Sequence, residues 1–161
     1  MQIRNGEIMI KPATAQDVDA IRSLFFDTVT TVNARDYNEE QIKMWSAGYA
    51  NVNGWLEKLV AQNFFIAKVE NMVLGFASLS NEGCVEYLYV HKDYQRKGIA
   101  GKLVEKIEQL ARELSLGEIW SDVSITAKPF FLNKGYRITH VYTKMVEGVS
   151  FENTIMKKKI D

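Results

Sequence analysis

The chain has 161 residues, which fits one domain with a sizeable core, and we predict a single domain over residues 1–161. Lysine plus arginine equals aspartate plus glutamate, 20 each, so no net charge draws the protein to nucleic acid or to an anionic membrane. The one cysteine, Cys84, excludes an internal disulfide and fits a reducing cytoplasm. No apolar run approaches the roughly 18 residues of a membrane span, and residues 1–14 lack the apolar core of a signal peptide. We therefore expect a cytoplasmic protein with neither nucleic acid nor membrane as a partner.

The first part of the chain combines a short strand with three helices. A strand that begins at residue 7 and ends near Pro12 leads into a helix over 14–29, in which apolar residues recur at helical spacing. Asn38 is a good N-cap for a second helix over 38–48, and residues 53–62 predict a third helix.

Three strand-like runs follow, at 63–70, 72–80 and 84–90. Short polar turns separate them, which predicts an antiparallel meander. The third run reads "CVEYLYV", and we expect all of it to be strand.

The helical pattern between Gly98 and Gly117 is the strongest in the chain. Its apolar residues form one stripe: Ile99, Leu103, Ile107, Leu110 and Leu114. Its charged residues lie mostly outside the stripe: Lys102, Glu105, Lys106, Glu108 and Glu113. We expect Gly117 to end this helix.

The last part of the chain predicts a strand at 118–124 and a short helix at 126–135 with Thr126 as its N-cap. Two more strands, 136–146 and 150–159, form a terminal antiparallel pair. The order predicts a mixed α/β domain of the layered α+β kind, with a mostly antiparallel sheet of about six or seven strands flanked by helices. A parallel neighbour is needed only where the long helix crosses over between two strands.

The loop before the long helix has the features of an anion site. Amides at a helix N-terminus lack intrahelical partners, and the helix dipole favours negative charge there. Gly98 and Gly101 let a ligand approach the backbone closely, and Arg96, Lys97 and Lys102 add positive charge. The competing interpretation is a solvated turn, because neither GxxxxGK[ST] nor GxGxxG is present.

The segment "QRKGIA", Gln95–Ala100, matches the Q/R-x-x-G-x-G/A signature of the GNAT superfamily of acyl-CoA-dependent N-acetyltransferases. The preceding "EYLYVHKDY" and the following "KLVEKIEQLARE" resemble that family's fourth strand and its next helix. Downstream, "SITAKPFFLNKGYR" resembles the family's NxxAxxfYxxxGF segment, and "ARDYNEEQIKMW" resembles an uncharacterised bacterial branch. The resemblance spans nearly the whole chain.

The resemblance implies a site for acetyl-CoA as cosubstrate, without a metal, in a gap where the fourth and fifth strands splay apart. It implies that backbone amides hold the pyrophosphate, within the segment Gln95, Arg96, Lys97, Gly98, Ile99, Ala100 and Gly101. It also implies that the backbone of Leu88, Tyr89 and Val90 pairs with the pantetheine arm. Ser124, Phe130 and Phe131 stand where family members contact the cofactor.

The proton donor for the departing thiolate is the point at which this chain departs from the family. Many members use the tyrosine of "fYxxxGF", and here that position is Phe131. Tyr37, Tyr142 and His140 are candidates to replace it, as is water.

Glu86 is the candidate general base for the acceptor amine. It stands in an otherwise apolar strand, and family members often place an acidic base on this strand. Two alternatives stay open for Glu86: it points to solvent, or it binds a cation of the substrate.

The implied activity is transfer of an acetyl group from acetyl-CoA to a primary amine of a small molecule or peptide, by direct attack in a ternary complex. The missing tyrosine leaves a non-catalytic acyl-CoA-binding module as the alternative. The first helices and the terminal strand pair would form the acceptor pocket, but they carry no readable substrate code. Many relatives pair as homodimers.

Overall fold

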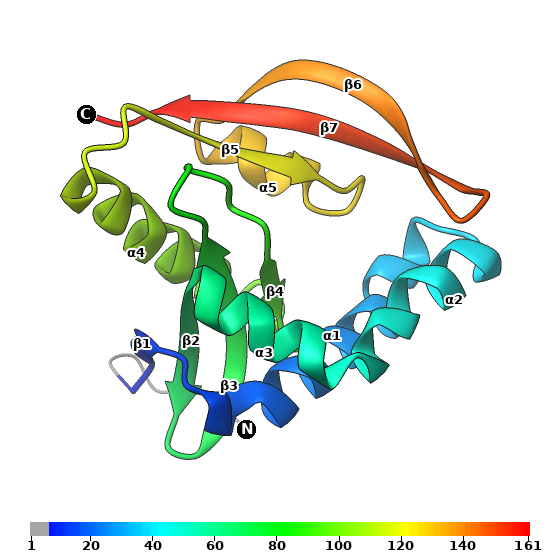
Figure 1. Ribbon diagram of the computed structural model, residues 1–161, viewed down its shortest axis with the longest axis horizontal. Helices are drawn as coiled ribbons and strands as arrows, with labels where there is room; N and C mark the ends of the chain where they lie inside the picture. Colours follow the sequence, from blue (N-terminus) through cyan, green and yellow to red (C-terminus); the bar gives the residue numbers. More distant parts are fainter. Residues whose placement is uncertain (1–6) are drawn as a thin grey trace.

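The computed structural model describes residues 7–161, which form two sheets and five α-helices (Figure 1). The strands are β1 (Met9–Pro12), β2 (Asn63–Val69), β3 (Met72–Leu79), β4 (Leu88–Val90), β5 (Glu118–Val123), β6 (Arg137–Val146) and β7 (Val149–Lys159). The helices are α1 (Val18–Thr31), α2 (Glu39–Ser46), α3 (Val52–Ala61), α4 (Ile99–Glu113) and α5 (Lys128–Asn133). The predicted mixed, mostly antiparallel fold of about six or seven strands is confirmed, with the strands divided between two sheets instead of forming one.

The strands divide into a four-stranded sheet, β1-β2-β3-β4, and a three-stranded sheet, β5-β7-β6, in which all ladders are antiparallel. One parallel bridge, Cys84–Trp120, connects them. At this bridge Val85 N donates to Trp120 O at 2.7 Å, and Trp120 N donates to Gly83 O at 2.9 Å. No ladder joins β4 to β5 in residues 7–161, so the two strands separate beyond the bridge, and Figure 1 shows the three-stranded sheet lying across the top of the four-stranded one.

Hydrophobic cores cover both faces of the four-stranded sheet, which explains why β2 and β3 read as continuous apolar runs. On one face Phe64, Ile66 and Phe76 pack with residues of α1 and α3. On the other face the core joins α4 to both sheets. The helices thereby fix the four-stranded sheet between two layers, with its β4 edge toward the second sheet.

The predicted strand over 84–90 is shorter than expected, because only Leu88–Val90 forms β4. Cys84 makes the isolated bridge to the other sheet, while Tyr87 N donates to the Ser78 hydroxyl at 3.2 Å instead of to a backbone carbonyl. The segment between bridge and strand thus changes direction, and it opens the gap between the sheets.

The exposed and buried faces of α4 differ from the prediction at two positions. Leu114, expected in the apolar stripe, lies beyond the end of the helix and is 43% exposed. Glu108, expected outside the stripe, is only 8% exposed. Its carboxylate accepts from Lys158 Nζ at 2.8 Å and from the Tyr136 hydroxyl at 3.2 Å, so its burial is compensated.

Two helix ends also differ from the prediction. Gly117 does not end α4, because the chain turns two residues earlier at Ser115, which has φ 57°. Thr126 does not cap α5, which begins at Lys128. The Thr126 hydroxyl donates instead to Asp36 at 2.7 Å and so joins α5 to the segment before α2.

Candidate active site

A cleft of about 1710 Å³ lies between the two sheets and extends to the start of α4 and to α1, α2 and α3. Most residues predicted to form the site line it: Tyr37, Glu86, Leu88, Tyr89, Val90, Gln95, Arg96, Gly98, Ile99, Ala100, Gly101, Ser124, Phe130 and Phe131. Three predicted or candidate residues are not among the residues that line it: Lys97, His140 and Tyr142.

The start of α4 presents free backbone donors to the cleft. The first helical bond runs from Lys102 N to Gly98 O, and the amides of residues 98–101 have no acceptor within the described part of the chain. Gly98 has φ 81°, a conformation that favours glycine, and a Cβ at this position would meet no atom within 4 Å. The space in front of these amides is therefore open. Lys134 Nζ lies near it, 3.3 Å from where a Cβ on Gly101 would be.

The Gln95 side chain connects this loop to β4. Gln95 Nε2 donates to Val90 O at 2.7 Å, and the Thr28 hydroxyl of α1 donates to the same oxygen at 2.9 Å. The position of the anion site relative to the strand is thus held by side-chain bonds from two elements.

The open edge of β4 offers fewer backbone groups than the sequence predicted. Ser78 N donates to Tyr87 O and His91 N to Leu74 O, so in this antiparallel register the backbone of Tyr89 faces β3. The N–H and C=O of Leu88 and the N–H of Val90 face the cleft. Of the three residues predicted to pair with an extended ligand, Tyr89 therefore contributes its ring instead of its backbone.

The wall opposite β4 comes from the segment after β5 and from α5. Ser124 Oγ accepts from Ala127 N at 3.2 Å. Phe131 is 2% exposed and packs edge-on against Tyr136, with ring centroids 5.0 Å apart. Phe131 thus supplies an apolar surface and no proton.

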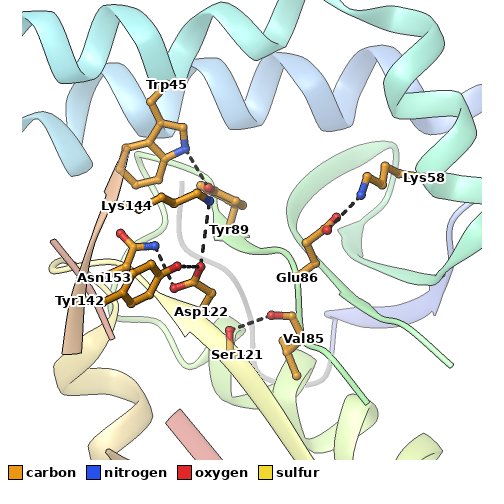
Figure 2. A network of polar contacts seen from close by, with 10 residues as sticks. All are labelled: Trp45, Lys58, Val85, Glu86, Tyr89, Ser121, Asp122, Tyr142, Lys144 and Asn153. Carbon is orange, nitrogen blue, oxygen red and sulfur yellow. Dashed lines mark hydrogen bonds and ion pairs between the residues drawn. The ribbon is translucent and has the colours of Figure 1, made fainter. Parts of the chain in front are cut away.

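The surroundings of Glu86 are polar, contrary to the expectation of an apolar neighbourhood. Lys58 Nζ lies 3.0 Å from Glu86 Oε1 (Figure 2). Gln62 Nε2 donates to Glu86 Oε2, also at 3.0 Å. Both partners come from α3 or the residue after it, because the turned segment before β4 directs this side chain toward that helix.

Of the three other candidate catalytic residues only Tyr37 lines the cleft, since neither Tyr142 nor His140 is among the lining residues. The Tyr37 hydroxyl accepts from Ile125 N at 2.8 Å, so its own proton remains available to the cleft. Burial raises the pKa of the Tyr37 hydroxyl above its ordinary value. His140 is exposed on β6, and its ring stacks on Tyr142 with centroids 5.6 Å apart.

A polar cluster lies on one face of the three-stranded sheet, with Phe151 of β7 on the same face: Asp122 of β5, Tyr142 and Lys144 of β6, and Asn153 of β7. Of these residues only Tyr142 was a candidate from the sequence. Directly opposed strand residues share a face, and the register pairs Tyr142 with Asn153 and Lys144 with Phe151. The Tyr142 hydroxyl donates to Asp122 Oδ2 at 2.5 Å, and Asn153 Nδ2 donates to Oδ1 at 3.0 Å (Figure 2). Partial burial and then the Asp122 carboxylate raise the pKa of Tyr142 to about 12.

Neither the Cys84 thiol nor a metal centre offers an alternative site among residues 7–161. Burial, followed by the charge of Glu86, raises the pKa of the Cys84 thiol to about 11, which disfavours a nucleophilic thiolate. In residues 7–161, no group of three or more His, Cys, Asp and Glu side chains is placed to hold a metal ion. Over the same residues, no helix is both long enough and apolar enough to cross a membrane.

Known proteins of similar structure share this fold over nearly its full length. A crystal structure from Rhodopseudomonas palustris, named a GCN5-related N-acetyltransferase and also aminotransferase, class-II, has a TM-score of 0.92 and 26% identity, and the match covers 99% of each chain. The PaiA N-acetyltransferase from Thermoplasma acidophilum, solved in complex with coenzyme A, has a TM-score of 0.79 and 20% identity over 94% of this chain and 98% of that one.

Sequence comparison leads to the same group of proteins. The uncharacterized N-acetyltransferase YafP of Escherichia coli (strain K12) is 28% identical over 154 residues, or 96% of this chain and 97% of that protein. A family model described as "Acetyltransferase (GNAT) domain" matches residues 33–160, which is most of the chain. The chain therefore belongs to the GNAT family of acetyltransferases.

Proposed function

We propose that this protein transfers an acetyl group from acetyl-CoA to a primary amine of a small molecule or peptide, within a ternary complex. The observation that carries the proposal is the set of free amides at residues 98–101, which open into the cleft between β4 and β5. The PaiA relative solved with coenzyme A supports it, as does a yncA structure from Salmonella typhimurium with acetyl-CoA, which has a TM-score of 0.74 and 18% identity.

The residues present fit a pyrophosphate followed by an extended arm. Free amides at a helix N-terminus bind phosphate oxygens, and Arg96 and Lys134 line the same end of the cleft. Leu88 and Val90 would pair with the amide groups of the pantetheine arm as a neighbouring strand does. When bound, acetyl-CoA supplies a thioester carbonyl as the acetyl donor.

The chain must then position an amine, remove its proton and return a proton to the sulfur. Phe131 cannot supply the second proton. Tyr37 stays a predicted acid, since its hydroxyl lines the cleft and keeps its proton free. Glu86 stays a predicted base, although Lys58 already compensates its charge. His140 is disfavoured by its position outside the residues that line the cleft.

The anion site is tested by Gly98→Ala, with Gly148→Ala as a matched control. Both glycines have nearly the same φ, 81° and 83°, and neither has an atom within 4 Å of a built Cβ. The two substitutions impose a similar backbone strain of about 1–2 kcal/mol, but only Gly98→Ala places a methyl group in front of the free amides. We expect calorimetry to show acetyl-CoA affinity lowered at least about tenfold by Gly98→Ala and unchanged by Gly148→Ala.

Equal acetyl-CoA affinity in the two variants would show that the amides of residues 98–101 do not form the anion site. No binding by the unaltered protein at millimolar acetyl-CoA would refute the proposed function. Release of free CoA with a panel of amines then separates an enzyme from the alternative, an acyl-CoA-binding module. Phe131 at the usual tyrosine position favours this alternative. A binding module would bind acetyl-CoA but release no CoA with any amine.

A further inference from the structure

The carboxylate of Asp122 is firmly held and still has room for another donor. Tyr142 and Asn153 each donate one hydrogen bond to it, one to each oxygen. An ionised carboxylate offers about four lone-pair positions, so each oxygen keeps one for a further ligand. Lys144 Nζ is 4.0 Å from Asp122 Oδ2, which is too far for a hydrogen bond.

Asp122 differs in this respect from Glu86, the other carboxylate lining the cleft near β4. Lys58 Nζ contacts Glu86 Oε1 at 3.0 Å, so Glu86 already has an ammonium partner at hydrogen-bonding distance. Asp122 has only Lys144 as a cationic partner, at the longer distance of 4.0 Å. An incoming ammonium group therefore gains more from Asp122 than from Glu86.

The neighbouring wall of the cleft is aromatic. Tyr37, Trp45 and Phe151 all line it, with ring centroids 5.2 Å apart for Tyr37 and Trp45 and 6.4 Å apart for Trp45 and Phe151. Trp45 Nε1 donates to the Tyr89 hydroxyl at 3.2 Å, which fixes the indole beside β4 (Figure 2). An apolar body attached to an amine would contact these rings when the amine is at Asp122.

We propose that Asp122 binds the ammonium group of the acceptor and takes its proton, and that the acceptor is a primary amine with an apolar or aromatic body. This proposal rests on the proposed acetyl transfer. Tyr142 and Asn153 act as positioning residues for the Asp122 carboxylate. Lys144 competes with the acceptor for the same negative charge.

The reaction balances without another reagent. Asp122 accepts one proton from the ammonium and later releases it to solvent. The neutral amine nitrogen forms a bond to the carbonyl carbon, and the bond from that carbon to sulfur breaks. The second amine proton passes to the thiolate, so the products are the acetylated amine, the free thiol and one proton.

The test compares Asp122→Asn with Lys144→Met, using release of free CoA with phenethylamine at saturating acetyl-CoA. We expect Asp122→Asn to lower kcat/KM by about 10²–10⁴-fold, because it removes both the charge and the proton acceptor. We expect Lys144→Met to lower KM for the amine by about threefold, because it removes a competing exposed cation. A loss of stability shared by the two variants could not produce changes in opposite directions.

The substrate class is tested with the pair phenethylamine and ethylamine, which differ in the aromatic ring. Burial of that ring against Tyr37, Trp45 and Phe151 should favour phenethylamine by at least about tenfold in kcat/KM. Equal use of the two amines, or no acetylation of phenethylamine, would overturn the assigned class.

Acetyl-CoA affinity, measured by calorimetry on the same samples, separates the possible failures. Unchanged affinity with unchanged turnover in Asp122→Asn would overturn the role of Asp122 and leave the proposed function intact. No acetyl-CoA binding by the unaltered protein would overturn both. A larger loss in Glu86→Gln than in Asp122→Asn would assign the proton to Glu86 instead.

Discussion

Ser115 ends α4 in a conformation that glycine adopts more readily. Its φ is 57°, its N–H donates to Arg112 O at 3.0 Å, and Leu116 N donates to Ala111 O at 2.9 Å. These two bonds form the paired closure of a Schellman motif, which satisfies helix carbonyls that would otherwise lack partners. A serine here carries a steric cost that the hydrogen bonds must offset.

We therefore predict that Ser115→Gly stabilises the protein by up to about 1 kcal/mol, or about 2–4 °C in Tm for a chain of this size. The free energy of unfolding in urea measures the effect. Gly117→Ala is the control: φ at Gly117 is not positive and no atom lies within 4 Å of its built Cβ, so this change should not destabilise. A destabilising Gly117→Ala with a neutral Ser115→Gly would show that Gly117 ends the helix after all.

Some residues of the candidate site could be predicted from the sequence, and others could not. The anion site at Gly98 and its basic neighbours could be predicted because its signal is local: a strand is followed directly by glycines and a helix. Asp122 was missed because one acidic residue on an alternating strand usually points to solvent. Its partners Tyr142 and Asn153 come from two other strands, and only the register of the three-stranded sheet brings them together.

At the scale of elements, the buried face of α4 is shorter than the apolar stripe in its sequence, because the stripe continues past the end of the helix. Leu103 is fully buried, whereas Leu114 is 43% exposed. The stripe was predicted from periodicity, and periodicity persists past the residue at which hydrogen bonding ends the helix.

We predict that Leu103→Ala costs about 2–5 kcal/mol of unfolding free energy, because it leaves a cavity between α4 and the sheet. The same substitution at Leu114 should change stability by less than about 1 kcal/mol. Urea unfolding of both variants checks the difference. Similar losses at the two sites would mean that the helix continues to bury its apolar face beyond Glu113.

The mixed fold and all three N-terminal helices could be predicted because each has its own periodic pattern and, for α2, a capping box in which Asn38 and Gln41 bond reciprocally at 2.8 Å. The short length of β4 could not be predicted. "CVEYLYV" is apolar except for Glu86, but Cys84 bridges to Trp120 of the other sheet while Leu88 pairs with Ala77. The sequence pattern of one segment cannot show that its first residue pairs with one sheet and its last residues with the other.

At the scale of the whole molecule, buried tyrosines link stability to alkaline pH. Burial, then the charge of Glu108, raises the pKa of Tyr136, and burial with the charge of Glu86 raises the pKa of Tyr87. Tyrosines of the unfolded chain ionise near pH 10, so these two groups contribute their full stabilisation below pH 10. That contribution is lost as the pH rises toward the folded-state pKa values.

We predict that the free energy of unfolding falls between pH 10 and pH 12, by about 1.4 kcal/mol per pH unit for each tyrosine that stays protonated only in the folded state. Urea unfolding at closely spaced pH values measures the slope. Tyr136→Phe should make that slope shallower by about 1.4 kcal/mol per pH unit, which corresponds to one proton. An unchanged slope in this variant would show that Tyr136 ionises alike in the folded and unfolded states.

The bridge between Cys84 and Trp120 joins the backbones of the two sheets. A rotation of one sheet relative to the other about this point, which we call the pivot, would widen or narrow the cleft. The Ser121 hydroxyl donates to Val85 O at 2.7 Å and reinforces that pivot from the buried side. Asp122 lies two residues from the bridge along β5, which is about 7 Å at strand spacing. A rotation of about 4° at the pivot would shift Asp122 by roughly 0.5 Å, which is the tolerance of a productive geometry. Cys84, Trp120 and Ser121 would thus help to set the width of the cleft at Asp122, although none of them is a candidate catalytic residue.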